Sequence, residues 1–160
     1  GFVIDLPVLP EVEPGLATVV LDQVQDAGNV GSILRSASAF GFQQIISIKG
    51  SCALWSPKVL RSSMGAHFAL TLIEGKSVED ISMLKVPLLA TSSHEGSFVG
   101  KTHLPWPCAW VLGHEGQGVQ AALEQMATQK LRINQPGGEE SLNVAAAASI
   151  CLFASSLHQN

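Results

Sequence analysis

Short apolar runs alternate with helix-like segments along most of the chain, and this alternation constrains the fold more than any other feature. The runs are rich in branched side chains, as strands buried on both faces are. They lie at residues 17–21, 44–48, 67–73, 87–91, 109–112 and 130–133. Segments with helical spacing of apolar residues lie at 29–40, 57–64, 77–84, 119–127 and 142–157. This order predicts an α/β fold with a mostly parallel sheet and ligand loops at the carboxyl ends of strands.

The domain organisation follows from length and from the first residues. A chain of 160 residues is long enough to bury the core of one domain. Residues 1–16 carry Pro7, Pro10 and Pro14 among acidic side chains, a pattern that resists helix and predicts an extended lead-in or linker. We expect the domain itself to span 17–160. Because the chain begins with Gly1 and not Met, we also expect a further N-terminal domain to belong to the protein.

Charge limits the kinds of partner. Only 14% of the residues are charged and the mean hydropathy is +0.29, so we expect a second subunit to cover part of the surface. The net charge of −4 argues against a strong sequence-independent hold on nucleic acid, which needs clustered Lys and Arg. We therefore expect other parts of the protein to provide most of the binding to any nucleic-acid partner.

Cysteine and histidine spacings give no sign of a metal or a disulfide framework. Cys52, Cys108 and Cys151 are far apart with no C-x-x-C pair, and the five histidines show no ligand spacing. No apolar run reaches the ~20 residues of a membrane span, and no export signal opens the chain. We expect a cytoplasmic protein with no metal and no membrane association.

Two glycine-rich loops, residues 113–118 and 134–143, each follow an apolar run. Glycine allows sharp turns and close approach of a ligand to the backbone, and Glu115, Ser141 and Asn143 place polar groups beside these turns. The loops predict a binding site at strand ends. The glycines have the wrong order for a dinucleotide loop, and neither a P-loop nor a G-x-S-x-G hydrolase elbow is present.

The last helical segment, residues 142–157, is apolar almost all round. Such a helix is buried on more than one face. At the end of a small domain, this pattern favours a helix that forms half of a dimer contact.

Three segments together resemble the motifs of one enzyme family. They are DAGNVGSILRSA at 26–37, VLGHEGQG at 111–118, and the stretch from Ile133 to Ala145 that contains SLNVA. In this order and spacing they resemble the SpoU (TrmH-type) branch of the SPOUT RNA 2′-O-ribose methyltransferases, over residues 17–157. Ile133-Asn134 stands where many relatives have Ile-Pro, and the acidic pair Glu139-Glu140 follows.

The resemblance implies a C-terminal trefoil knot, which no compositional feature indicates, and a homodimer whose interface includes the last helix. It implies S-adenosyl-L-methionine as cofactor and RNA as substrate. By position in the motifs, the cofactor site is expected to include Thr91, Gly113, Ile133 and Leu142. The catalytic or substrate-side residues are expected to be Asn29, Arg35, Glu115, Ser141 and Asn143.

Each of these polar residues also has a simpler interpretation. Asn29 is a good helix N-cap, Glu115 a loop carboxylate, and Asn143 a first-turn helix residue. Arg35 lies off the apolar stripe of its helix; a guanidinium pKa above 12 makes it a poor base, so we interpret it as binding phosphate and stabilising the developing alkoxide. Lys58 and Arg61 are candidate RNA contacts, although a solvated helix face explains them equally well.

The sequence therefore predicts methylation of a ribose 2′-hydroxyl in ribosomal or transfer RNA, without deciding between the two. Two alternatives stay open. One is a non-catalytic RNA-binding or regulatory dimer with the same fold, and the other is a nucleotide-binding oxidoreductase domain.

Overall fold

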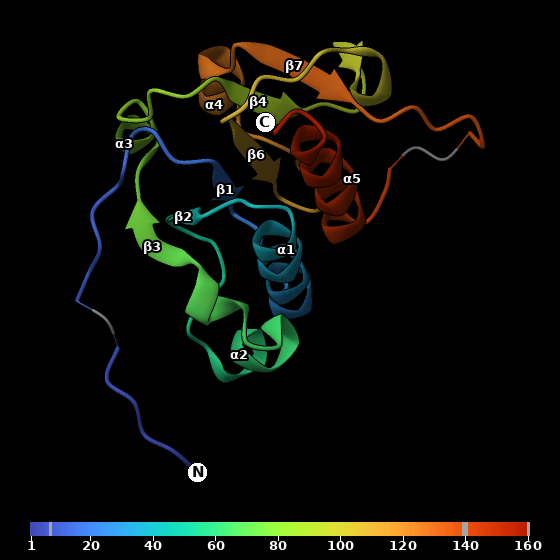
Figure 1. Cartoon of the computed structure of the whole chain (residues 1–160). Helices are drawn as coiled ribbons and strands as arrows, with labels where there is room; N and C mark the ends of the chain where they lie inside the picture. The colour runs from blue at the N-terminus through green and yellow to red at the C-terminus, as the bar shows by residue number, and fades with distance from the viewer. Residues whose placement is uncertain (7, 139–140, 160) are drawn as a thin grey trace.

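The computed structural model describes residues 1–6, 8–138 and 141–159. Within them, seven strands form one sheet in the order β3-β2-β1-β6-β4-β7-β5, with every pair of neighbours parallel (Figure 1). The predicted α/β fold with a parallel sheet is confirmed. The strands are Thr18–Asp22 (β1), Gln44–Ile48 (β2), Thr71–Lys76 (β3), Leu88–Thr91 (β4), Ser97–Phe98 (β5), Ala109–Gly113 (β6) and Gln129–Arg132 (β7).

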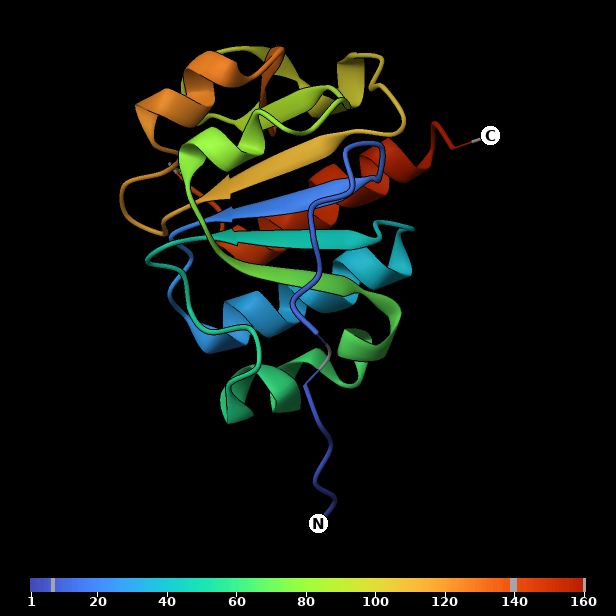
Figure 2. The ribbon, with the colours of Figure 1, turned by 90° about the vertical axis from the view of Figure 1, so that its left-hand side faces the viewer.

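Helices cover both faces of the sheet (Figures 1 and 2). The longer helices lie on one face, where α5 packs beside α1 and α2 beside the opposite side of α1. The short helices α3 and α4 lie on the other face. None of the helices in the described ranges has the length and hydropathy needed to cross a membrane. The helices are Ala27–Ala39 (α1), Pro57–Ser63 (α2), Val78–Ile81 (α3), Ala121–Met126 (α4) and Val144–Ser156 (α5), with 3₁₀ turns at Ala66–Ala69 (η1) and Val99–Lys101 (η2).

The central strands are buried on both faces, which explains their continuous apolar runs. In β1, Val19 and Leu21 belong to the core beneath α1 and α5, whereas Val20 belongs to the core beneath α3 and α4. Trp110 of β6 is fully buried, and its Nε1 donates to Ser155 Oγ of α5 at 2.8 Å. The indole thereby ties the last helix to the middle of the sheet.

The order of strands reverses beside β1. From β1 the chain moves outward through β2 to β3, then crosses to the other half of the sheet. Strand β6 later returns to lie between β1 and β4. In open parallel sheets, ligands bind outside the carboxyl ends of the strands at such a point of reversal.

Two local predictions were wrong. Helix α1 begins at Ala27 and its N-cap is Asp26, whose Oδ1 accepts the Asn29 N–H at 2.8 Å, so Asn29 is not the cap. The predicted strand at 67–73 begins instead at Thr71. His67 is held in the 3₁₀ turn η1, where its ring nitrogens bond Ser63 Oγ and the Leu54 carbonyl.

Other differences concern lengths. The helices predicted at 77–84 and 119–127 are shorter, as α3 and α4, and α5 ends one residue early, at Ser156. The two-residue strand β5 was not predicted, because its pairing with β7 depends on tertiary contact and not on an apolar run.

The end of the lead-in already contacts the domain. Val12 is buried in the core beneath α3, and the Glu13 N–H donates to Gln44 Oε1 at 2.9 Å. The apolar side chains among residues 2–9 are exposed. The division into lead-in and domain at residue 17 stays a prediction.

Helices α1 and α2 approach closely at Gly31. A Cβ at this position would overlap the side chain of Ser62 and lie 2.8 Å from its backbone carbonyl carbon. Ser62 Oγ in turn donates to the Ala27 carbonyl at 3.1 Å. The spacing of the two helices therefore depends on the absence of a side chain at Gly31.

We expect Gly31→Ala to lower the free energy of unfolding by about 1–3 kcal/mol, because forcing a methyl group into a packed contact shifts the backbone. Alanine's better helix propensity offsets about 1 kcal/mol at most. Urea denaturation measures the change. Gly100→Ala is the control, since no atom lies within 4 Å of a Cβ built there; equal stability of the two variants would contradict the close approach.

Candidate functional site

A cavity of about 870 Å³ lies at the carboxyl ends of β4, β6 and β7 and beside the start of α5. Thr91, Gly113, Ile133 and Leu142 all line it, as do three of the five polar residues singled out from the sequence, Glu115, Ser141 and Asn143. The structure thus brings the second and third motifs together. Glu139 and Glu140 of the third motif lie outside the described residues.

Gly113 is required where β6 ends. A Cβ at this position would overlap the backbone of Gly118 and Val119. The loop closes on itself through two hydrogen bonds, His114 N–H to the Gly118 carbonyl at 3.1 Å and Gly118 N–H to the His114 carbonyl at 2.8 Å. A tight turn of this kind leaves its outer backbone beside the cavity.

The side chain of His114 stabilises the same turn. Its Nδ1 accepts the N–H groups of Gly116 at 3.0 Å and Gln117 at 3.1 Å. With Nδ1 as acceptor, the neutral ring carries its proton on Nε2. Sequence reasoning gave His114 no role; the signal for it is a histidine directly before a glycine-rich loop.

A buried carboxylate holds this loop against β1. Asp22 is 2% exposed, and its two oxygens accept the backbone N–H of Gln120 at 2.7 Å and the Gln120 side-chain amide at 2.6 Å. The end of β1 and the segment after the 113–118 loop are therefore fixed relative to each other. Asp22 was not predicted as a site residue.

Asn143 joins the last helix to the first. Its Oδ1 accepts the N–H groups of Ala145 at 2.9 Å and Ala146 at 3.1 Å, which makes it the N-cap of α5. Its Nδ2 donates to Asn29 Oδ1 at 3.0 Å. The first motif, on α1, thereby reaches the edge of the cavity through an amide–amide contact.

Glu115 faces the start of α1 from the other side. Its Oε1 accepts the Asp26 N–H at 3.3 Å. Partial burial raises the pKa of the Glu115 carboxyl, but hydrogen bonds from its own N–H, from the N–H groups of Asp26 and Gln25 and from the Asn29 side chain outweigh this, and the net pKa lies below 4.5. Asn29 thus bonds Asn143 and lies near Glu115, and the carboxylate is charged at neutral pH.

Arg35 is not brought into this group. It lies further along α1, exposed and outside the cavity lining. Its location off the apolar stripe is as predicted. No ion pair joins it to another described residue.

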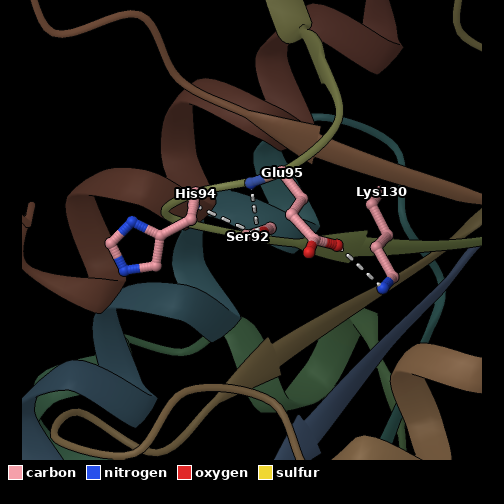
Figure 3. Close-up of polar contacts among 4 residues, drawn as sticks. All are labelled: Ser92, His94, Glu95 and Lys130. Carbon is pink, nitrogen blue, oxygen red and sulfur yellow. Dashed lines mark hydrogen bonds and ion pairs between the residues drawn. The ribbon is translucent and has the colours of Figure 1, made fainter.

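The loop after β4 lines the cavity. Figure 3 shows the polar contacts that hold this loop. Ser92 Oγ accepts the N–H groups of His94 at 3.3 Å and Glu95 at 3.1 Å, which folds the loop on itself. Glu95 Oε2 then pairs with Lys130 Nζ of β7 at 3.2 Å. An ion pair this exposed contributes little stability, but it joins two walls of the cavity.

Gln135 is a further lining residue that sequence reasoning missed. Its Oε1 is buried and has no hydrogen-bond partner among the described residues. A buried acceptor without a partner costs free energy unless a ligand supplies a donor.

Within the described ranges, no group of three or more His, Cys, Asp and Glu side chains forms a possible metal site.

The fold and the cavity define an α/β domain with a ligand site at the strand reversal of a parallel sheet. Comparison with known proteins makes this specific, because residues 17–153 match the model of the SpoU rRNA Methylase family. The chain belongs to this family, and the resemblance deduced from the three motifs is confirmed.

The similar proteins are methyltransferases by name. The chain is 33% identical over 150 residues to the 23S rRNA (guanosine(2553)-2′-O)-methyltransferase RlmP of Bacillus subtilis, covering 91% of this chain and 60% of that protein. An AdoMet-bound rRNA methyltransferase from Sinorhizobium meliloti superposes with a TM-score of 0.83 at 30% identity, over 93% of this chain and 59% of that one. The AdoMet complex of AviRb from Streptomyces viridochromogenes gives 0.80 at 26% identity, over 91% and 61%. The chain thus spans about three-fifths of these proteins.

The lowered pKa of Glu115 predicts how stability depends on pH. A carboxyl with a lowered folded-state pKa stabilises the fold above its unfolded value, near 4.5, and this contribution disappears as the pH falls through the folded value. We expect Glu115→Gln to be less stable than wild type at pH 7 and to approach wild type at pH 3 in urea denaturation. Glu124→Gln, on α4 in the same cavity, is the control; a pH-independent difference for Glu115→Gln would contradict the charged hydrogen-bonded state.

Proposed function

We propose that this chain is the catalytic domain of an S-adenosyl-L-methionine-dependent RNA 2′-O-ribose methyltransferase, acting on ribosomal or transfer RNA. One observation carries the proposal: a single cavity is lined by the second and third family motifs, and the first motif is tied to its edge through Asn29 and Asn143. Membership of the SpoU rRNA Methylase family favours this function over an oxidoreductase domain. Similar proteins with bound AdoMet support the choice of cofactor.

The cavity fits such a cofactor. Its volume is in the usual range for a small-molecule site, and its wall combines apolar side chains with the turn at Gly113. Thr91, Ile133 and Leu142 complete the proposed cofactor site, and the free Oε1 of Gln135 is placed to accept a hydrogen bond from it. When bound, the cofactor supplies an electrophilic methyl group on a sulfonium.

The polar residues are proposed to position the ribose and to relieve charge as its hydroxyl loses a proton. In-line displacement requires close orientation of the attacking oxygen, which Asn29, Ser141 and Asn143 provide by hydrogen bonding. The Glu115 carboxylate holds Asn29 and the start of α1 in place. Arg35 binds a neighbouring phosphate and stabilises the developing alkoxide, since its guanidinium retains its proton.

The wider assembly is also part of the proposal. Ile150, Phe153 and Leu157 form an exposed apolar stripe on α5, 41%, 50% and 67% exposed, and Phe40 extends it through an edge-to-face contact with Phe153. This surface supports a homodimer through α5 and the neighbouring C-terminal loops.

We further propose a trefoil knot, supported by the path of the chain from β7, beyond β4, back to α5 beside α1.

We also propose a further N-terminal domain and a cytoplasmic location. Since the chain spans 60% of the Bacillus relative, an N-terminal domain that contributes to RNA binding is consistent with its length. The three cysteines carry no disulfide, which supports a reducing, cytoplasmic location.

Transfer of a labelled methyl group to unmodified 23S rRNA and transfer RNA transcripts tests the function. We expect one 2′-O-methylated nucleotide on mapping, and calorimetric binding of S-adenosyl-L-methionine but not NAD. Binding of RNA without cofactor heat or transfer would favour a non-catalytic dimer instead.

Asn29→Ala is expected to lower transfer by at least about tenfold while retaining cofactor binding, because Asn29 lies outside the cavity lining. Gln125→Ala, exposed on α4, is the matched control.

The variant Arg35→Lys tests whether residue 35 binds phosphate or accepts the proton. A lysine keeps the positive charge for phosphate but loses the planar fork. We expect a raised KM for RNA, and a pH–rate profile of the same shape as wild type. A new rising limb towards the lysine pKa, with little activity at neutral pH, would show instead that residue 35 accepts the proton.

A further inference from the structure

Charge is distributed very unevenly along this acidic chain. Residues 27–73 contain no Asp or Glu, yet they hold four of the nine basic residues, Arg35, Lys49, Lys58 and Arg61, all exposed. The remaining residues hold five basic side chains and all 13 acidic ones. The net charge of −4 therefore hides a positive region formed by α1, α2 and their connections.

A second hollow lies within this region, between the start of α1 and the start of α2. It has a volume of about 540 Å³, and its lining includes Gln25, Asp26, Cys52, Pro57 and Lys58. The Asp26 carboxylate is engaged as the cap of α1. Lys58, which follows Pro57 in the lining, is charged and has no ion pair among the described residues.

The second hollow shares a wall with the proposed cofactor cavity. The backbone N–H of Asp26, which lines the hollow, donates at 3.3 Å to the carboxylate of Glu115, which lines the cavity. Asn29 lies at the same junction, bonded to Asn143. A strand whose ribose reached Asn29 would have the proposed cofactor cavity on one side and the hollow on the other.

We propose that the basic surface of α1 and α2 binds the RNA strand next to the target ribose, with the hollow at Cys52 and Lys58 holding one flanking nucleotide. This inference rests on the proposed function and names the substrate side of the same site. It explains how an acidic domain contributes to RNA binding: the phosphates meet Lys58, Arg61 and Arg35, whereas the acidic residues lie elsewhere in the sequence.

The chemistry of the hollow matches a nucleotide. Pro57 offers an apolar face on which a base can pack, and the side-chain amide of Gln25 offers a donor and an acceptor for a base edge. Lys58 and Arg61 lie on the same short helix, and Arg35 follows Gly31 by one turn on α1, which packs on that helix. A positively charged groove of this kind follows the phosphates of single-stranded RNA.

Cys52 provides a direct probe of the hollow. It is the partly exposed thiol of the chain, whereas Cys108 and Cys151 are buried, with the pKa of their thiols raised by burial to about 11 and about 12. A thiol reagent such as DTNB at pH 8 should therefore modify Cys52 first. We expect saturating 23S rRNA transcript to slow this reaction at least about fivefold, and saturating S-adenosyl-L-methionine alone to leave it unchanged. An unchanged rate with RNA bound would overturn the assignment.

Charge reversal tests the surface independently. We expect Lys58→Glu with Arg61→Glu to weaken binding of the transcript at least about tenfold and to lower the slope of log affinity against log salt by about 0.7 for each phosphate that is no longer neutralised. Lys85→Glu with Lys76→Glu makes the same charge change beyond α1 and α2, and should keep most of the affinity. Equal weakening in the two double variants would overturn the proposal.

Different results would contradict the proposed methyl transfer and the proposed RNA-binding surface. If the wild-type protein binds RNA and protects Cys52 but transfers no methyl group, the proposed function is wrong and the RNA surface stands. If it transfers methyl groups while neither Cys52 nor the α2 charges respond to RNA, the function stands and the surface is wrong. Circular dichroism of each variant confirms that weaker binding does not come from unfolding.

Discussion

The side-chain amide of Asn143 is the contact on which the candidate site depends. One end of the amide caps α5 and the other bonds Asn29 on α1. A carboxylate at this position could cap the helix equally well but could not donate to Asn29, and a serine would be too short to do both. Because Glu115 accepts the N–H of Asp26 at the start of the same helix, two amides and one carboxylate bring together three segments that lie far apart in the sequence. The cavity is bounded by this junction on one side and by the sheet on the other.

The sheet and the position of a binding site at its strand ends were predictable from local patterns, whereas the individual lining residues were predicted through the family resemblance. Continuous apolar runs such as that of β1 occur where a strand is covered on both faces, and parallel strands place their carboxyl ends at one edge. Glycine at 113 marks the turn that the chain must make there. Thr91, Ile133 and Leu142 then meet at one cavity as a consequence of topology. What these residues bind was predictable only through resemblance, since spacing alone allows any small ligand.

The errors occurred where a distant contact outweighs local preference. Asn29 has the side chain of a good N-cap, but the helix begins earlier, because the carboxylate of Asp26 caps it by accepting the Asn29 N–H, and the Asn29 side chain is left to bond Asn143. The segment around His67 has the composition of a strand, but its buried ring bonds across to Leu54 and holds a 3₁₀ turn. Gln135 and Asp22 gave no signal at all. A glutamine in a loop and an aspartate at a strand end are ordinary until the surrounding fold removes water from them.

Net charge was the least informative of the sequence features, and the reason is physical. Phosphates respond to the potential within about one Debye length, roughly 8–10 Å, so a protein presents each face separately to a strand of RNA. An average over 160 residues mixes the acid-free region of α1 and α2 with acidic segments on other elements. At the junction between the two cavities, the carboxylates are those of Glu115 and of Asp26, and both are bonded to the start of α1. In the proposed complex, fixed negative charge there would repel phosphates, so the strand would place its neutral ribose against these carboxylates and its phosphates beside the basic residues.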